Sequence, residues 1–245
     1  MSKNIVIVGG HGQVALRLTR LLTLKHAVTS IIRDPAHAAD ITAASATPLV
    51  LSIEDSTPAD FAKVFTGKDV VYYTAGSGGK GGEARHKSVD HEGAVKVFDA
   101  IEAVEGTKPR LILISSVDVR DTTKPPPAQY NDEDIAMSKS LYEQIPKYMA
   151  AKYAADKDLS QRTAFKWTVV RPGWLSDAPG TGKVTAGRTH ITASIPRDDV
   201  AKVLATLLDR EDAASLAIDI VTGDSPVEDA LDSVIKNRVN AYTDL

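Results

Sequence analysis

The stretch Gly9-Gly10-His11-Gly12-Gln13-Val14-Ala15 decides the fold. It follows the apolar run Asn4–Val8, which has the length of a strand, and it opens a segment with helical periodicity. In the pattern G-x-x-G-x-x-A, we expect Gly9 to make a tight turn, Gly12 to approach a pyrophosphate and Ala15 to pack helix against strand. The N–H groups of Gly12, Gln13 and Val14 are then expected to face the phosphates of a dinucleotide, with the helix dipole behind them.

Apolar runs of strand length alternate with helical segments along the chain, which is typical of a parallel sheet covered by helices on both faces. The predicted strands are Asn4–Val8, Ala27–Ile32, Pro48–Leu51, Asp69–Tyr73, Arg110–Ser115, Lys166–Arg171 and Ala217–Val221. The predicted helices are Gln13–Leu24, Pro58–Phe65, Lys87–Glu105, Asp132–Leu159 with a break at Pro146, Asp198–Leu208 and Val227–Ala241. Right-handed crossovers predict a Rossmann-like, doubly wound α/β fold of about seven parallel strands in the order 3-2-1-4-5-6-7.

We expect residues 1–245 to form a single NAD(P)-binding domain with substrate loops in its C-terminal part. Three polar or glycine-rich loops, Gly76–Gly82, Asp121–Tyr130 and Ser176–Ser194, follow predicted strands. Because ligands of doubly wound sheets bind at the carboxyl ends of the strands, these loops are expected to hold the substrate.

Composition excludes several classes of function. The net charge of −3 predicts neither a nucleic-acid partner nor an anionic membrane surface. The sequence has no cysteine, which excludes disulfides, thiolate catalysis and thiolate metal sites. The six histidines show no metal-ligand spacing, so no metal site is expected. Without an apolar run long enough to span a membrane or a signal-peptide pattern, the protein is expected to be cytoplasmic.

The end of the second predicted strand carries the cofactor preference. An NAD site places Asp or Glu there to accept from the ribose 2′-hydroxyl, whereas this chain has Arg33, followed by Asp34 and Pro35. The guanidinium of Arg33 suits a 2′-phosphate, so the sequence predicts NADP(H) in preference to NAD(H). The alternative is that Arg33 is a surface arginine paired with Asp34.

Six features in order give the chain a resemblance to a known family. They are Gly9–Ala15, Thr74-Ala75-Gly76, Ser115-Ser116, Tyr148-Met149-Ala150-Ala151-Lys152, Arg171-Pro172-Gly173 and Ile195-Pro196-Arg197-Asp198-Asp199-Val200-Ala201. With them the sequence resembles the atypical short-chain dehydrogenases/reductases. It is most similar to the small single-domain NAD(P)H-binding proteins related to biliverdin-IXβ/flavin reductases and NmrA-like proteins.

The resemblance implies positions along the cofactor. Thr74–Gly76 would line the ribose and nicotinamide side, and Pro172–Leu175 would run along the nicotinamide. Ser52 and Ile53 would lie beside the adenine, although the family often has Asp where this chain has Ser52. The complete expected cofactor-binding set is Gly9, His11, Gly12, Gln13, Val14, Arg33, Ser52, Ile53, Thr74, Ala75, Gly76, Ser115, Lys152, Pro172, Gly173, Trp174 and Leu175.

The expected catalytic residues are Ser116, Tyr148 and Lys152. Tyr148 and Lys152 are one helical turn apart, hence on one face. A lysine ammonium beside a phenol favours the phenolate, so we expect it to lower the pKa of Tyr148 toward neutrality. Lys152 could also hold the nicotinamide ribose. Ser116 could hydrogen-bond a substrate carbonyl, with Ser115 as the competing choice, although the family's Ser/Thr often lies further on, where this chain has Val117 and Asp118.

Two classes of function follow. The first is an NAD(P)H-dependent oxidoreductase acting on a small carbonyl, flavin or quinone-like substrate, or a related epimerase or dehydratase. The second is a dinucleotide-binding sensor without turnover, which need not keep Tyr148 and Lys152. A hydrolase is disfavoured: Ala75-Gly76-Ser77-Gly78-Gly79 resembles a nucleophile elbow, but that elbow turns directly into a helix and here more loop residues intervene.

Overall fold

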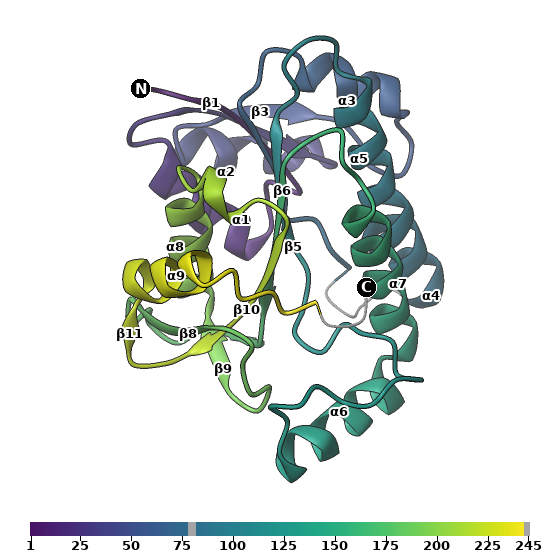
Figure 1. Cartoon of the computed structure of the whole chain (residues 1–245). Coiled ribbons are helices and arrows are strands. Elements are labelled where there is room, and N and C mark those ends of the chain that lie inside the picture. Colours follow the sequence, from purple (N-terminus) through teal and green to yellow (C-terminus); the bar gives the residue numbers. More distant parts are fainter. Residues whose placement is uncertain (78–81, 243–245) are drawn as a thin grey trace.

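A parallel sheet forms the centre of the computed structural model, which describes residues 1–77 and 82–242 (Figure 1). Its parallel strands are β1 (Asn4–Val8), β2 (Ala27–Ile32), β3 (Thr47–Val50), β4 (Val70–Tyr73), β5 (Arg110–Ile114), β6 (Trp167–Pro172) and β10 (Leu216–Thr222). They lie in the order β10-β6-β5-β4-β1-β2-β3, which confirms the predicted order of the seven strands. Two antiparallel strands, β8 (Lys183–Gly187) and β11 (Ser225–Pro226), extend the sheet to nine strands beyond β10.

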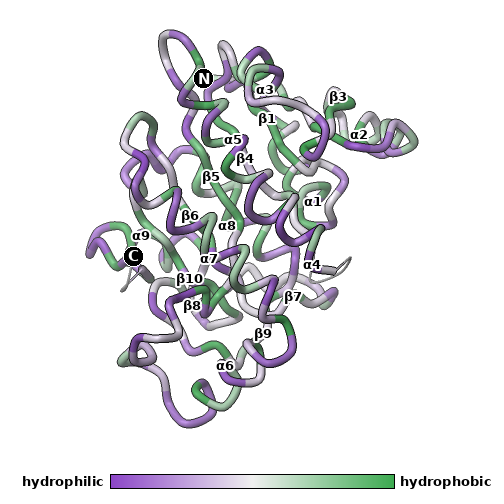
Figure 2. The backbone as a smooth tube through the Cα atoms, turned by 90° about the vertical axis from the view of Figure 1, so that its right-hand side faces the viewer, coloured by the Kyte–Doolittle hydropathy of each residue, from purple (hydrophilic) through white to green (hydrophobic). Residues whose placement is uncertain are grey.

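Helices cover both faces of the sheet, as Figure 1 shows. One face carries α1 (Gln13–Leu22), α8 (Arg197–Leu207) and α9 (Val227–Lys236), and the other carries α3 (Pro58–Phe65), α5 (Glu92–Ala103) and α7 (Pro146–Ser160). Strand β1 supplies both cores by simple alternation: Ile5 and Ile7 join one apolar cluster, and Val6 and Val8 join the other. Figure 2 shows the central strands as hydrophobic and the helices and loops as mixed.

Local signals set several helix ends. Thr57 and Asp60 form a capping box at the start of α3, and Asn131 and Asp134 do the same for α6 (Asp132–Gln144). The predicted break at Pro146 is confirmed, because α6 ends at Gln144 and Pro146 occupies the first position of α7.

Other predicted boundaries were wrong. The predicted helix Lys87–Glu105 is instead a π-helix η2 (His86–His91) followed by α5, which ends at Ala103, and an unpredicted short helix α4 (Gly82–Arg85) precedes them. The segment 176–194, predicted as a loop, contains β8, and a small parallel pair of β7 (Trp174–Ser176) and β9 (Ser194–Pro196) joins its two ends. The last helix ends at Lys236, and a short turn η1 (Pro35–His37) with helix α2 (Ala38–Ala43) was not predicted.

The predicted loop Gly76–Gly82 lies partly outside the described residues, at positions 78–81. Over the part of the chain that the structure describes, no helix combines the length and the apolar character needed to cross a bilayer.

Candidate NAD(P)H-binding and active site

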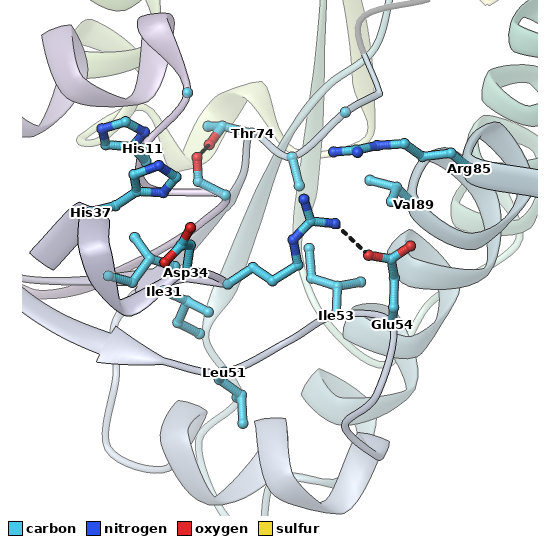
Figure 3. Close-up of a pocket in the computed structure, with 16 residues that line it drawn as sticks. His11, Ile31, Asp34, His37, Leu51, Ile53, Glu54, Thr74, Arg85 and Val89 are labelled. Carbon is cyan, nitrogen blue, oxygen red and sulfur yellow. Dashed lines mark hydrogen bonds and ion pairs between the residues drawn. The ribbon is translucent and has the colours of Figure 1, made fainter. Parts of the chain in front are cut away.

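A cleft opens at the carboxyl edge of the sheet, where the strand order reverses between β1 and β4. Its volume is about 270 Å³, and the ends of β1, β2, β3 and β4 supply most of its walls. The lining residues are Gly9, His11, Gly12, Ile31, Ile32, Arg33, Asp34, His37, Leu51, Ile53, Glu54, Thr74, Ala75, Gly76, Arg85 and Val89 (Figure 3). This reversal is where doubly wound folds bind dinucleotides.

The glycine turn is shaped as its sequence requires. Gly9 has φ +81°, and a Cβ there would lie 2.6 Å from the Cα of Ala75, so only glycine fits. Gly12 has an extended backbone, and its N–H donates to the carbonyl of Gly9 at 3.0 Å. This N–H is therefore engaged within the turn itself. Helix α1 begins at Gln13 without a capping side chain, which leaves the N–H groups of Gln13 and Val14 for an anion.

Arg33, which follows β2, and Glu54, which follows β3, form an ion pair in the cleft. Arg33 Nη1 donates to Glu54 Oε2 at 2.7 Å, the interaction dashed in Figure 3. The alternative pairing of Arg33 with Asp34 is not what forms, because Asp34 accepts instead from the N–H of Ala36 and caps η1. The hydrogen bond from Arg33 lowers the pKa of the Glu54 carboxyl, so Glu54 is ionised at neutral pH.

Two histidines form the opposite wall. The rings of His11 and His37 stack with centroids 3.6 Å apart, and His11 Nε2 lies 2.7 Å from Asp40 Oδ2. Figure 3 shows both rings on the side of the cleft across from Arg85 and Glu54. The wall is therefore polar and preformed beside the glycine turn.

The residues after β3 only partly match their expected place. Ile53 lines the cleft, but Ser52 does not, and its hydroxyl accepts from the N–H of Asp55 at 3.3 Å. After β4, the Thr74 hydroxyl donates to the carbonyl of Val8 at 2.8 Å, which ties the strand-four turn to the glycine turn. Thr74, Ala75 and Gly76 all line the cleft.

The residues expected along the nicotinamide lie beyond this cleft, at the end of β6. Gly173 has no room for a Cβ, which would lie 2.6 Å from the carbonyl oxygen of Ala193. Trp174 and Leu175 follow in β7 and are 49% and 39% exposed.

The two serines after β5 have different environments. Ser115 is buried, and its hydroxyl donates to Asp156 Oδ2 at 2.8 Å. Ser116 is half-buried, and its hydroxyl has no partner among residues 1–77 and 82–242, while its carbonyl accepts from Arg171 Nε at 3.1 Å. Ser116 is thus the serine with a hydroxyl available to a substrate.

Tyr148 and Lys152 lie on one face of α7, with the lysine Nζ 5.8 Å from the centroid of the tyrosine ring. Lys152 is buried and pairs with Asp90, its Nζ lying 3.2 Å from Oδ1. Burial raises the pKa of Tyr148 above its usual value, and the opposing attraction of Lys152 does not overcome this, since Asp90 and Asp156 also raise it. The expectation of a tyrosine pKa near neutrality was wrong.

A hydrolase-like arrangement also fails on geometry. The Ser77 hydroxyl does lie 2.6 Å from His86 Nδ1. However, Asp90 Oδ2 approaches that same nitrogen at 3.7 Å and also accepts from the serine hydroxyl. A Ser-His-Asp triad needs the carboxylate on the other ring nitrogen, so these residues do not form one.

Comparison with known proteins assigns the chain to a family. The family described as NAD(P)H-binding matches residues 9–211. The chain belongs to this NAD(P)H-binding family. The UPF0659 protein C216.03 of Schizosaccharomyces pombe is 38% identical over 97% of both chains. YhfK of Bacillus subtilis, named as an uncharacterized sugar epimerase, is 31% identical over 93% of this chain and 98% of its own.

Solved structures of similar proteins share the fold. A candidate NAD-dependent epimerase/dehydratase from Bacillus halodurans is 30% identical, with a TM-score of 0.78, over 95% of this chain and all of its own. The oxidoreductase ylbE from Lactococcus lactis has the same TM-score at 25% identity, over 95% and 97% of the two chains. The cleft of this family member is therefore the candidate NAD(P)H site, and it is called the NAD(P)H cleft below.

Several residues of the NAD(P)H cleft were not predicted. His37, Glu54, Arg85 and Val89 all line it. Arg85 and Val89 lie in the segment between β4 and α5, where no motif marks them, and Glu54 approaches Arg33 only through the fold. Within residues 1–77 and 82–242, no group of three or more His, Asp or Glu side chains could hold a metal ion.

Proposed function

We propose that the chain is an NAD(P)H-dependent oxidoreductase that acts on a small carbonyl, flavin or quinone-like substrate. One observation carries the proposal: Tyr148 and Lys152 share a face of α7, and Lys152 Nζ contacts the end of β5 at the carbonyl of Ile114, 3.4 Å away. The free hydroxyl of Ser116 follows two residues later. The oxidoreductase name of the Lactococcus lactis relative supports the same reaction class.

Each residue has a definite task in this reaction. The bound dinucleotide supplies the hydride. Tyr148 keeps its proton at neutral pH because its pKa is raised, so it can donate that proton to a substrate oxygen. Ser116 donates a hydrogen bond to the same oxygen, and the Lys152 ammonium would hold the nicotinamide ribose.

We infer that the preferred cofactor is NADP(H). Two arginines, Arg33 and Arg85, line the cleft, and the Nε of Arg85 is buried without a hydrogen-bond partner among the described residues. Two guanidinium groups favour a 2′-phosphate over a hydroxyl. The carboxylate of Glu54 opposes this preference, because a phosphate must displace it from Arg33.

A second candidate is a dinucleotide sensor without turnover. The observation that favours it is the ion pair of Lys152 with Asp90. Among residues 1–77 and 82–242, this pair leaves Tyr148 without an activating cation at hydrogen-bond distance. An epimerase, as the Bacillus subtilis relative is named, would use the same cleft and the same hydride chemistry.

The deciding experiment measures NADPH consumption by the purified protein with a panel of aldehydes, ketones, quinones and flavins, alongside calorimetric binding of NADPH and NADH. We expect NADPH to bind more tightly than NADH and at least one acceptor to be reduced. Tight NADPH binding with no turnover across the panel favours the sensor. No binding of either dinucleotide contradicts both candidates.

A further inference from the structure

A buried polar cluster lies behind the strand-four turn, outside the NAD(P)H cleft. It consists of Ser77, His86, Asp90 and Lys152, which are 8%, 7%, 1% and 5% exposed. Ser77 follows β4, His86 and Asp90 belong to η2, and Lys152 belongs to α7. Burying so many polar side chains costs free energy unless each finds partners.

Asp90 is the centre of this cluster. Its Oδ1 lies 3.2 Å from Lys152 Nζ, and both of its oxygens lie 3.3 Å from the N–H nitrogen of Ser77. The Ser77 hydroxyl makes a further close hydrogen bond to Oδ2. Lys152 and Ser77 therefore both donate to one carboxylate.

The directions of these hydrogen bonds follow from the chemistry of the groups. A carboxylate only accepts, so the Ser77 hydroxyl must donate its proton to Asp90. The Ser77 oxygen can then only accept from His86 Nδ1, which lies 2.6 Å away. His86 must carry a hydrogen on Nδ1, and the cluster has one consistent arrangement of hydrogens.

The helix that carries Asp90 is anchored on its other side as well. The Tyr73 hydroxyl donates to the carbonyl of Val89 at 2.5 Å, and the Ser88 hydroxyl donates to Glu54 Oε1 at 3.0 Å. Helix η2 is a π-helix, a conformation that is rare and is frequent at functional sites. It connects the wall of the NAD(P)H cleft to Lys152.

We propose that Asp90 is a positioning residue for Lys152. This inference rests on the proposed function, in which Lys152 holds the nicotinamide ribose. Asp90 supplies the only carboxylate paired with Lys152 within residues 1–77 and 82–242, and it fixes the ammonium where it also reaches the carbonyl of Ile114. Asp156, one turn further along α7, accepts from Ser115 instead. Ser77 and His86 act one step further out, since they hold Asp90.

A double-mutant cycle tests the inference. The variants are Asp90→Asn, Lys152→Met and their combination, with NADPH dissociation constants from calorimetry and stabilities from urea unfolding. We expect each single change to weaken NADPH binding about tenfold, because Lys152→Met removes the ammonium and Asp90→Asn removes the carboxylate that positions it. The double variant should have a dissociation constant no larger than that of the single variant that binds NADPH less tightly. In urea, the double variant should be more stable than Asp90→Asn, which leaves a buried ammonium unpaired.

The matched control is Asp99→Asn on α5, whose carboxylate pairs with Arg162 at 2.7 Å and is 46% exposed. This change should leave NADPH affinity within about twofold of the wild type. In the combination with Lys152→Met, the fold-changes in the NADPH dissociation constant should multiply. If the effects of Asp90→Asn and Lys152→Met also multiply, Asp90 does not act through Lys152 and the inference is wrong.

A milder variant covers the case in which Asp90→Asn does not fold. Ser77→Ala keeps the Asp90–Lys152 pair but removes the hydroxyl that orients Asp90, so NADPH binding should weaken by about two- to fivefold. Nitrogen NMR of His86 should show hydrogen on Nδ1 in the wild type and a mixture of tautomers in Ser77→Ala. Unchanged NADPH affinity together with an unchanged tautomer would overturn the role of the cluster.

Failure of the proposed function gives a different result. If the wild type binds neither NADPH nor NADH, the proposed function fails, yet urea unfolding of Lys152→Met, Ser77→Ala and their combination still tests the cluster. Non-additive stabilities support the connection of Ser77 to Lys152 through Asp90, and additive stabilities contradict it.

Discussion

Arg33 Nη1 lies 2.7 Å from Glu54 Oε2, so the cation expected to receive a 2′-phosphate already holds a carboxylate. The two side chains are 54% and 32% exposed, and exposed ion pairs are worth only about 0.2–1 kcal/mol. A phosphate dianion can therefore displace Glu54 at little cost. The preference for NADPH over NADH then depends on both residues. Substituting Arg33 should weaken NADPH binding, and substituting Glu54 should strengthen it.

Arg33→Ala should weaken NADPH binding about tenfold or more and leave NADH nearly unchanged, because a lost charge-assisted contact costs about 1.5–3 kcal/mol. Calorimetric titration of both cofactors measures this. Arg20→Ala, which removes an exposed cation from α1, is the control and should change neither affinity. NADH bound as tightly as NADPH by the wild type would contradict the assignment of Arg33.

Glu54→Gln should have the opposite effect. Removing the carboxylate frees Arg33 and removes a negative charge near the phosphate, so NADPH should bind about two- to fivefold more tightly. NADH should gain nothing, because its ribose carries no phosphate. The ratio of the two dissociation constants is the informative quantity, and a ratio unchanged from the wild type would show that Glu54 lies outside the phosphate site.

Gly12→Val should abolish binding of both cofactors while the fold persists. The backbone of Gly12 is extended, and a Cβ there would lie 3.3 Å from the carbonyl oxygen of Gly9, so the turn has to shift by only a few tenths of an ångström to admit it. The branched side chain would occupy the space of the pyrophosphate. Gly12→Ala should give an intermediate loss. Native circular dichroism with unaltered affinity in Gly12→Val would place the phosphates elsewhere.

The sequence predicted what short-range patterns encode. The apolar run Asn4–Val8 before the glycine turn predicted β1, and the strand order followed from right-handed crossovers. Strand β8 was missed because Val184 is its only large apolar residue, and β11 because it has only two residues; both pair only through the fold.

The site was harder to predict because its decisive contacts join distant segments. Arg33 was identified from its place after β2, but no sequence pattern near Glu54 predicts that its carboxylate contacts Arg33. The i, i+4 spacing placed Tyr148 and Lys152 on one face, yet the pKa of Tyr148 depends on burial and on Asp90, which lies in a π-helix that local periodicity does not indicate.

The raised pKa of Tyr148 predicts the pH dependence of turnover. Burial pushes this pKa above its ordinary value of 10, so the proton-donating form persists through neutral and mildly alkaline pH. The kcat for carbonyl reduction should therefore show no alkaline decline governed by Tyr148 below about pH 10. A decline centred near pH 7 that disappears in Tyr148→Phe would show that the cofactor complex lowers this pKa.

Tyr148→Phe separates enzyme from sensor. The change removes the transferable proton and keeps the ring, which packs edge-on against His86 with centroids 5.7 Å apart. Loss of general acid help should lower carbonyl reduction by about 10²–10⁴-fold, while NADPH affinity should barely change. Lys152→Met should lower both, since the ammonium also holds the ribose.

A flavin acceptor makes this comparison sharper. Direct hydride transfer to a flavin needs little from a protein acid, so Tyr148→Phe should reduce a flavin nearly as fast as the wild type does. Both activities are measured from NADPH absorbance in the same preparation, which makes the flavin rate an internal control for folding and cofactor binding. Undiminished carbonyl reduction in Tyr148→Phe would remove Tyr148 from the mechanism, and the proton would then have to come from Ser116 or from water.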